Sequence, residues 1–364
     1  MNATQAVVDL DDVEGLLAAD RDGLLRAAST AGAQVRATAA ALDEGDLDVL
    51  KSDQPPRTVT WVAGRGNAET AGSMLSATLG GSVAAPIVVA CETPPWIGAL
   101  DVLILAGDDP GDPALVSAAA TGVRRGARIV VVAPYDGPLR DATAGRSVSL
   151  APRLWVRDDF SLARYLAAGL AVLQVVDPDL RVDLAALADE LDAEAFRNSA
   201  GRELFTNPAK TLAERMSGRD VVLAGDKAAT LALARHGAAV LLRIAHKAVA
   251  AVGLADALVA LQGGMAGGSG DDHERSSIFH DEQIDGPLQR RIRTFVLTTD
   301  DERPMVLSRV SGHDDVDVVN AEDVPEVSET AVAVESAPGR EEQQLGILAV
   351  RLEMAATYLR LVRG

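Results

Sequence analysis

Uninterrupted runs of apolar residues recur in the first half of the chain, and stretches with helical spacing separate them. Runs of Val, Ile and Leu without polar alternation are typical of strands buried on both faces, as in a parallel sheet covered by helices. We therefore expect a doubly wound α/β unit. Its predicted strands are 57–64, 85–91, 101–107, 127–134 and 147–152, and its predicted helices are 67–79, 114–126 and 159–176.

The same alternation returns in the second half of the chain and predicts a second α/β unit. Its expected elements are a helix at 208–216, a strand at 219–226, helices across 227–253, a strand at 291–300, a strand near 329–334 and a long helix at 340–362.

The order of these elements predicts the α/β fold class, with two tandem doubly wound parallel-sheet subdomains and helical N-terminal and C-terminal segments. Leucines at roughly helical spacing predict two helices over 9–42, within an N-terminal segment of residues 1–56. We place the first subdomain at 57–178 and the second, with the C-terminal helix, at 179–364. The Gly-rich, acidic stretch 262–275 is expected to be either an active-site lid or a flexible connection.

The charge of the chain limits its partners. The 364 residues carry a formal net charge of −19, and only four of the basic residues are lysines. An acidic chain repels nucleic acid and anionic membranes. The apolar stretches around 162–176 and 238–261 are too short or too charged to span a bilayer. We expect neither nucleic acid nor a membrane as a partner.

Cysteine usage and the N-terminus indicate the compartment. Cys91 is the only cysteine, so no internal disulfide forms, as is usual in a reducing compartment. At the end of an apolar run it fits a small core residue, with a reactive thiol as the alternative. The acidic start of the chain lacks the basic and apolar regions of a signal peptide. These features predict a cytoplasmic protein.

A glycine-rich turn after the first predicted strand is the first candidate ligand site. Gly64, Arg65, Gly66 and Asn67 join that strand to a helix start. Glycines let the backbone approach an anion, and a helix N-terminus adds positive charge. The alternative is an ordinary strand-to-helix turn. Glu69 occupies the third glycine position of a G-x-G-x-x-G motif, which argues against a dinucleotide, and we expect no cofactor.

Three aspartates follow the predicted strand at 101–107, at the edge where open α/β sheets bind ligands. Asp108, Asp109 and Asp112 would oppose an anionic ligand. They would suit Mg²⁺ or a cationic ligand instead. We favour a third role, as helix N-cap and turn residues, and assign no metal ligand.

Two further positions carry candidate chemistry. Arg153 follows Pro152 at another strand end, where it either reaches a sugar hydroxyl or phosphate or lies on the surface. His280 precedes Asp281 and Glu282, and a histidine beside carboxylates can move protons near neutral pH. A solvated helix start is the alternative for this segment.

Five segments together resemble the sugar isomerase (SIS) superfamily. They are GRGNAETAG, GVRRGARIVVVAP, LAPR, NPAKTLAERM and FHDEQIDG. Their order and spacing are similar to those of bacterial and archaeal bifunctional phosphoglucose/phosphomannose isomerases and of their actinobacterial TobH-like relatives. The resemblance extends over most of the chain, from about residue 10 to residue 362.

The resemblance implies two SIS-type subdomains, usually in a homodimer. It also implies interconversion of aldose and ketose 6-phosphates through a cis-enediol. In the family a Glu is the base, a His assists ring opening, and Ser/Thr-rich loops hold the phosphate. Gly64 and Gly66 match the family's glycine loop, and His280 matches the histidine of its HNE motif. Asp281, Glu282 or an acidic residue of the 271–274 stretch could then substitute as base.

The sequence departs from the family at its reactive groups. Ile244 stands at the place of the catalytic Glu, and no Asp or Glu occurs between Lys227 and Ala255. Ala68 stands where a phosphate-contacting Ser belongs, and aspartates replace the hydroxyls of the second loop. The resemblance therefore implies an SIS protein with a degenerate active site.

Three functional hypotheses follow. The leading one is a sugar-phosphate or other carbohydrate-derivative binding protein of hexose or mannose metabolism, isomerase-like, with weak or no catalysis. The second is an active phosphoglucose/phosphomannose isomerase that uses His280 and Glu282. The third is a non-catalytic partner or regulator of another enzyme. The predicted substrate-binding residues are Gly64, Arg65, Gly66, Asn67 and Arg153.

Overall fold

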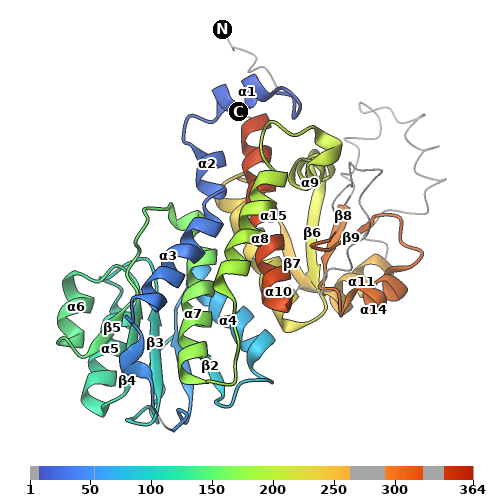
Figure 1. Ribbon diagram of the computed structural model, residues 1–364. Coiled ribbons are helices and arrows are strands. Elements are labelled where there is room, and N and C mark those ends of the chain that lie inside the picture. Colours follow the sequence, from blue (N-terminus) through green and yellow to red (C-terminus); the bar gives the residue numbers. More distant parts are fainter. Residues whose placement is uncertain (1–7, 53, 263–291, 323–339, 364) are drawn as a thin grey trace, which may run out of the picture.

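Two parallel sheets, one in each half of the chain, form the framework of the protein (Figure 1). The computed structural model describes residues 8–52, 54–262, 292–322 and 340–363. The first sheet has the strand order β2-β1-β3-β4-β5. Its strands are β1 (Val59–Val62), β2 (Ile87–Ala90), β3 (Val102–Ala106), β4 (Arg128–Val132) and β5 (Ser147–Ser149). Each lies within a predicted strand, and the expected α/β fold class is confirmed.

The second sheet has the order β7-β6-β8-β9. Its strands are β6 (Asp220–Gly225), β7 (Ala250–Gly253), β8 (Ile292–Leu297) and β9 (Val316–Val319). The helices predicted across 227–253 are wrong at 250–253, where small apolar residues form the edge strand β7. The sequence pattern also misses β9, because Asp317 interrupts its apolar run. The strand predicted near 329–334 lies outside the described residues.

Helices join the two sheets. Helix α4 (Gly66–Leu79), which follows β1, packs against α10 (Ala228–Arg243), which follows β6. The C-terminal helix α15 (Glu341–Arg363) contacts α10 and also α8 (Leu184–Arg197) and α9 (Pro208–Met216), so it runs through the middle of the molecule (Figure 1). In the described part of the chain, no helix is long and apolar enough to cross a membrane.

The N-terminal segment covers both halves of the chain. It forms α1 (Val13–Ala19), α2 (Leu24–Ala28) and α3 (Ala31–Asp43), where the sequence predicts two helices. Helix α3 packs against both α7 (Leu162–Val176) and α8. The remaining helices are α5 (Pro113–Arg125), α6 (Gly137–Thr143), α11 (Leu254–Gln262) and α14 (Arg303–Val310), with short 3₁₀ turns η1 (Asp48–Leu50), η2 (Asp158–Phe160) and η3 (Leu204–Thr206).

Trp61 of β1 sets the close packing of the first sheet against its helices. Its side chain is buried, and its Nε1 donates a hydrogen bond to the carbonyl oxygen of Ala68 at 2.8 Å. Glycines make room for the indole: a Cβ on Gly72 of α4 would lie 2.4 Å from its Cδ1, and one on Gly169 of α7 3.1 Å from its Cζ3. The first turn of α4 is therefore held close to the end of β1.

Candidate functional site

The two chain connections at the centre of the first sheet leave β1 and β3 in opposite directions. The chain passes from β1 through α4 to β2, and from β3 through α5 to β4 on the other side. In open α/β sheets, such a reversal leaves a crevice at the carboxyl ends of the two strands, where ligands bind. The glycine loop after β1 and the aspartate-rich loop after β3 border this crevice.

A pocket of about 370 Å³ occupies the crevice, and we call it the switch-point pocket. Arg243, which ends α10, reaches it from the second half of the chain. Both halves therefore contribute to one site. The lining residues with chemical or backbone roles include Gly64, Arg65, Gly66, Asp108, Asp158 and Arg243.

Backbone groups of the glycine loop are open to the switch-point pocket. Gly66 has a φ of 67°, a conformation that favours glycine. A Cβ on Gly64 or Gly66 would meet no atom within 4 Å. Helix α4 begins at Gly66 and is 14 residues long, so its first amides and its dipole favour an anion at this position. The loop thus has the backbone geometry that the sequence predicts.

Asn67 supports the pocket from behind. The residue is buried, and its Nδ2 donates hydrogen bonds to the carbonyl oxygen of Asp158 at 2.7 Å and to Ser161 Oγ at 3.1 Å. Its Oδ1 accepts a long bond from Arg243 Nη2, at 3.4 Å. The side chain therefore holds the segment at 158–161 against α4. It positions the pocket wall, and its role in substrate contact stays a prediction.

Two arginines supply the positive charge of the pocket, and both are loosely held. Arg65 lies 3.7 Å from Asp112 and is three-quarters exposed, while Arg243 Nε lies 3.4 Å from Asp159 Oδ1. Exposed ion pairs of this length contribute little to stability. Both guanidinium groups can therefore turn toward an anionic ligand at small cost.

Asp108 forms the opposite wall and is firmly held. Its Oδ1 accepts hydrogen bonds from Arg164 Nη2 at 2.8 Å and from the Tyr165 hydroxyl at 2.5 Å. The Arg164 guanidinium also stacks on the Tyr165 ring, 4.4 Å from its centroid. Partial burial and the nearby charge of Asp108 raise the pKa of Asp158. This wall offers carboxylate oxygens that suit hydroxyl or amine donors.

The other two aspartates of the loop have the cap and turn roles that the sequence favours. Asp112 is the N-cap of α5 and accepts from the amide of Ala114 at 2.8 Å, and Asp109 accepts from the amide of Gly111 at 2.8 Å. In the described ranges, no group of three or more His, Cys, Asp or Glu side chains is arranged to hold a metal ion. The magnesium alternative therefore has no ligand cluster in this part of the chain.

The described residues place no carboxylate of α10 at the pocket. Ile244, which follows that helix and which the family resemblance aligns with the catalytic Glu, is buried in the core. Its neighbour Arg243 is the residue that faces the pocket. A base on this helix is absent, as the sequence comparison implies.

Arg153, the remaining predicted residue that the structure describes, does not line the switch-point pocket. Arg153 lines a different cavity, and its guanidinium binds Glu44 at 2.6 and 2.9 Å and Asp46 at 2.9 Å. His280, Glu282 and most of the loop predicted at 262–275 lie outside the described residues. Their roles stay predictions.

Sequence reasoning misses three residues that shape the site. Arg243 lies far along the chain from Asp158 and Arg164, and it reaches the site only through the packing of α10 against α4. The available signal is weak: Arg164 and Arg243 are charged residues within strongly apolar helices. Such a charge often marks a helix end or cleft wall, but its partners cannot be assigned without the fold.

Comparison with solved structures supports the fold. No protein-family model and no curated protein matches the chain. The tagatose-6-phosphate ketose/aldose isomerase of Escherichia coli is similar over 99% of this chain and 95% of its own, with a TM-score of 0.60 and 13% identity. The C-terminal domain of glucosamine-fructose-6-phosphate aminotransferase from Francisella tularensis covers 96% of both chains, with a TM-score of 0.58 and 10% identity.

A third solved structure is also similar over nearly the whole chain. A glucose-6-phosphate isomerase like protein from Thermus thermophilus matches 98% of this chain and 94% of its own, with a TM-score of 0.52 and 18% identity. All three similarities run through both sheets and the connecting helices, since they cover nearly the whole chain. The chain therefore shares the fold of these three proteins, in agreement with the SIS-type fold that the sequence predicts.

Proposed function

We propose that the protein binds a sugar phosphate, or a similar anionic carbohydrate derivative, in the switch-point pocket, with weak or no isomerase catalysis. The observation that carries this proposal is the convergence of Arg65 and Arg243, from different halves of the chain, on the open glycine loop at the start of α4. Phosphosugars in the names of the similar structures support it. A place in hexose or mannose metabolism and a cytoplasmic homodimer are part of the same proposal.

The charges of the pocket suggest how such a ligand would lie. Each carboxylate on the aspartate side repels an anionic group, so the phosphate is expected on the side of Arg65, Arg243 and the α4 N-terminus. Asp108 and Asp158 then face the sugar hydroxyls. Charged groups that accept from or donate to neutral hydroxyls form stronger hydrogen bonds than neutral pairs do. A polyol with one anionic end matches both walls.

Catalysis is the weaker part of the family resemblance. Isomerisation through an enediol needs a base within hydrogen-bond reach of the reacting carbon. Helix α10 has no Asp or Glu to supply it. Asp108, the carboxylate beside the glycine loop, is already engaged by Arg164 and Tyr165. We therefore propose binding without rapid turnover.

Arg243→Gln is expected to weaken the binding of glucose 6-phosphate or mannose 6-phosphate about 10- to 100-fold, since a hydrogen bond to a charged group contributes about 1.5–3 kcal/mol. Isothermal titration calorimetry measures this effect. Arg235→Gln, an exposed arginine on the same helix, is the matched control and should change nothing. Equal affinity of the Arg243→Gln variant and the native protein would contradict the proposed position of the phosphate.

A coupled assay with fructose 6-phosphate as product tests the absence of catalysis. We expect the native protein to turn over glucose 6-phosphate and mannose 6-phosphate no faster than the His280→Ala and Glu282→Gln variants. A thermal-shift series with the same sugars runs beside the assay. Turnover above both variants would instead support an active isomerase that uses His280 and Glu282. The absence of both turnover and a thermal shift would favour the role of a protein partner or regulator.

A further inference from the structure

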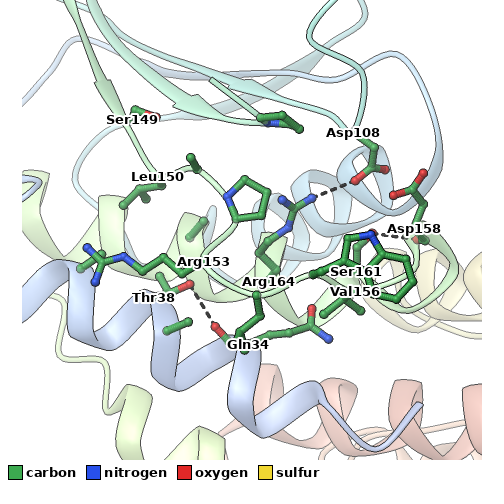
Figure 2. Close-up of a pocket in the computed structure, with 18 of the residues that line it drawn as sticks. Gln34, Thr38, Asp108, Ser149, Leu150, Arg153, Val156, Asp158, Ser161 and Arg164 are labelled. Carbon is green, nitrogen blue, oxygen red and sulfur yellow. Dashed lines mark hydrogen bonds and ion pairs between the residues drawn. The ribbon is translucent and has the colours of Figure 1, made fainter. Parts of the chain in front are cut away.

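A second cavity, of about 600 Å³, lies at the carboxyl ends of β4 and β5, and we call it the β5 cavity (Figure 2). Helices α3 and α7 border it on one side, and the segment at 149–156 borders it on the other. It adjoins the switch-point pocket, because Asp108 and Asp158 line both. The proposed function makes no use of this space.

The lining of the β5 cavity suits a neutral ligand group. Four of its five charged residues form ion pairs: Arg164 binds Asp108, and Arg153 binds Asp46 as well as the nearby Glu44, while Asp158 is the fifth. Pockets of 300–1,000 Å³ with an apolar lining and few polar groups are typical small-molecule sites. The apolar lining includes Ala37, Ala41, Leu150, Pro152, Val156 and Ala168.

One buried polar atom in the cavity lacks a partner among the residues that the structure describes. Gln34 of α3 is only 3% exposed, and its Nε2 donates hydrogen bonds to the carbonyl oxygen of Phe160 at 2.9 Å and to Thr30 Oγ1 at 3.1 Å. Its Oε1 has no hydrogen-bond partner there. Figure 2 shows this oxygen directed into the cavity, above α3.

The orientation of the Gln34 amide is determined by its neighbours. A flipped amide would place Oε1 against the Phe160 carbonyl oxygen, which accepts hydrogen bonds and donates none. The nitrogen must therefore face Phe160, and the oxygen must point away from that carbonyl group, as Figure 2 shows. Buried acceptors are nearly always satisfied in proteins, so an unsatisfied one that faces a cavity indicates a missing donor.

Ser149, at the end of β5, adds a second polar group. Its Oγ is buried and likewise has no hydrogen-bond partner in the described part of the chain. Figure 2 places Ser149 at the β5 end of the cavity, away from Gln34 on α3. Apolar side chains make up part of the remaining lining. The cavity thus has one such polar group near each of two walls and apolar side chains in its lining.

We propose that the β5 cavity binds a neutral, ring-sized apolar group that carries an N–H or O–H donor for Gln34 Oε1. The ring packs against the apolar lining. Since the cavity meets the switch-point pocket at Asp108 and Asp158, this group is a substituent of the carbohydrate derivative bound there. The link to the carbohydrate rests on the proposed function, whereas the ring site itself does not.

Phenol and toluene test the cavity itself, by titration calorimetry with the full chain. Phenol is expected to bind the native protein about tenfold more tightly than it binds Gln34→Met, the factor that one hydrogen bond of ordinary net strength supplies. Toluene has the same ring size and no donor, so its affinity should be unchanged by that substitution. Equal phenol affinities of the native protein and Gln34→Met would overturn the proposal.

A second variant fills the cavity and leaves Gln34 intact. Ala37 lines the cavity, so Ala37→Phe should abolish the binding of both phenol and toluene. Ala33→Phe, at an exposed position on the same helix, is the matched control and should bind as the native protein does. Undiminished binding to Ala37→Phe would place the compounds elsewhere and would also overturn the proposal.

The link to the carbohydrate is tested separately, with the 6-phosphates of phenyl and methyl β-glucosides. The phenyl compound is expected to bind the native protein at least tenfold more tightly, the effect of burying a ring-sized apolar group, and Ala37→Phe should remove the difference. If phenol behaves as expected but the two glucosides bind equally, the ring site stands and its connection to the carbohydrate is refuted. Failure of the proposed function is thereby distinguishable from failure of the cavity.

Discussion

Replacing Arg351 by methionine is expected to lower the free energy of unfolding by about 3–5 kcal/mol, because it leaves a buried carboxylate without its main partner. Arg351 of α15 is 1% exposed, and its Nε donates to Glu194 Oε1 of α8 at 2.7 Å. The guanidinium also donates to the carbonyl oxygens of Asn320 and Ala321 after β9, at 2.7 and 2.8 Å. One side chain therefore connects α15, α8 and the end of the second sheet.

The effect of this substitution depends on pH. Burial raises the pKa of Glu194, but the charge and hydrogen bonds of Arg351 outweigh it and hold that pKa below its usual value. A carboxylate whose pKa is lowered by folding contributes stability above its unfolded pKa, and this is lost as the pH falls through the folded pKa. The difference between the native protein and Arg351→Met should thus be largest near neutral pH and shrink below about pH 4.

Urea unfolding at pH 7 and at pH 3.5 measures both effects. Arg36→Met is the matched control, because Arg36 of α3 also pairs with acidic residues of α8, Asp189 and Asp192, but at an exposed site. Exposed pairs contribute about 0–1 kcal/mol, so this variant should stay close to the native protein. If Arg351→Met lost no more stability than Arg36→Met, the buried pair would have no special role.

Local patterns of the sequence predict most of the framework, and their failures have physical causes. The three central strands of the first sheet, β1, β3 and β4, are buried on both faces, so their apolar runs are unambiguous. The edge strands of the second sheet, β7 and β9, have less distinct sequence patterns. In β7 the residues are small and half-buried, and such a run also fits a helix. In β9 Asp317 interrupts the pattern because it binds Arg293 at 2.6 and 2.8 Å.

In the candidate site, too, the features formed by neighbours in the sequence are predictable and those formed by packing are not. The glycine loop is predictable because a strand, a turn and a helix start are neighbours in the sequence. The contribution of Arg243 is not, since it depends on the packing of α10 against α4. For Arg153, the sequence predicts the position at a strand end. It does not predict the ion pair with Glu44, which depends on the fold of the N-terminal segment. The Gln34 oxygen that has no partner among the described residues has no sequence signature at all.

Trp61→Ala is the second substitution with a large expected effect, and it links stability to the site. Removal of a buried tryptophan typically costs about 3–5 kcal/mol, from lost burial and the cavity that remains. Gly72 and Gly169, which lie against the indole, have no side chains that could fill this space. Trp61→Phe keeps a ring but loses the hydrogen bond to Ala68, so its cost should be smaller, about 1–3 kcal/mol.

Urea unfolding of Trp61→Ala, with Trp96→Ala as control, measures this cost. Trp96 is 42% exposed, so its removal should cost about 1 kcal/mol or less. Ala68 lies in the first turn of α4, directly after the glycine loop, so Trp61→Phe should also weaken sugar-phosphate binding under conditions where it is fully folded. Native affinity in a destabilised Trp61→Phe would mean that the glycine loop keeps its geometry without the indole. Weaker binding would show that the bond to Ala68 holds the α4 N-terminus in its place at the switch-point pocket.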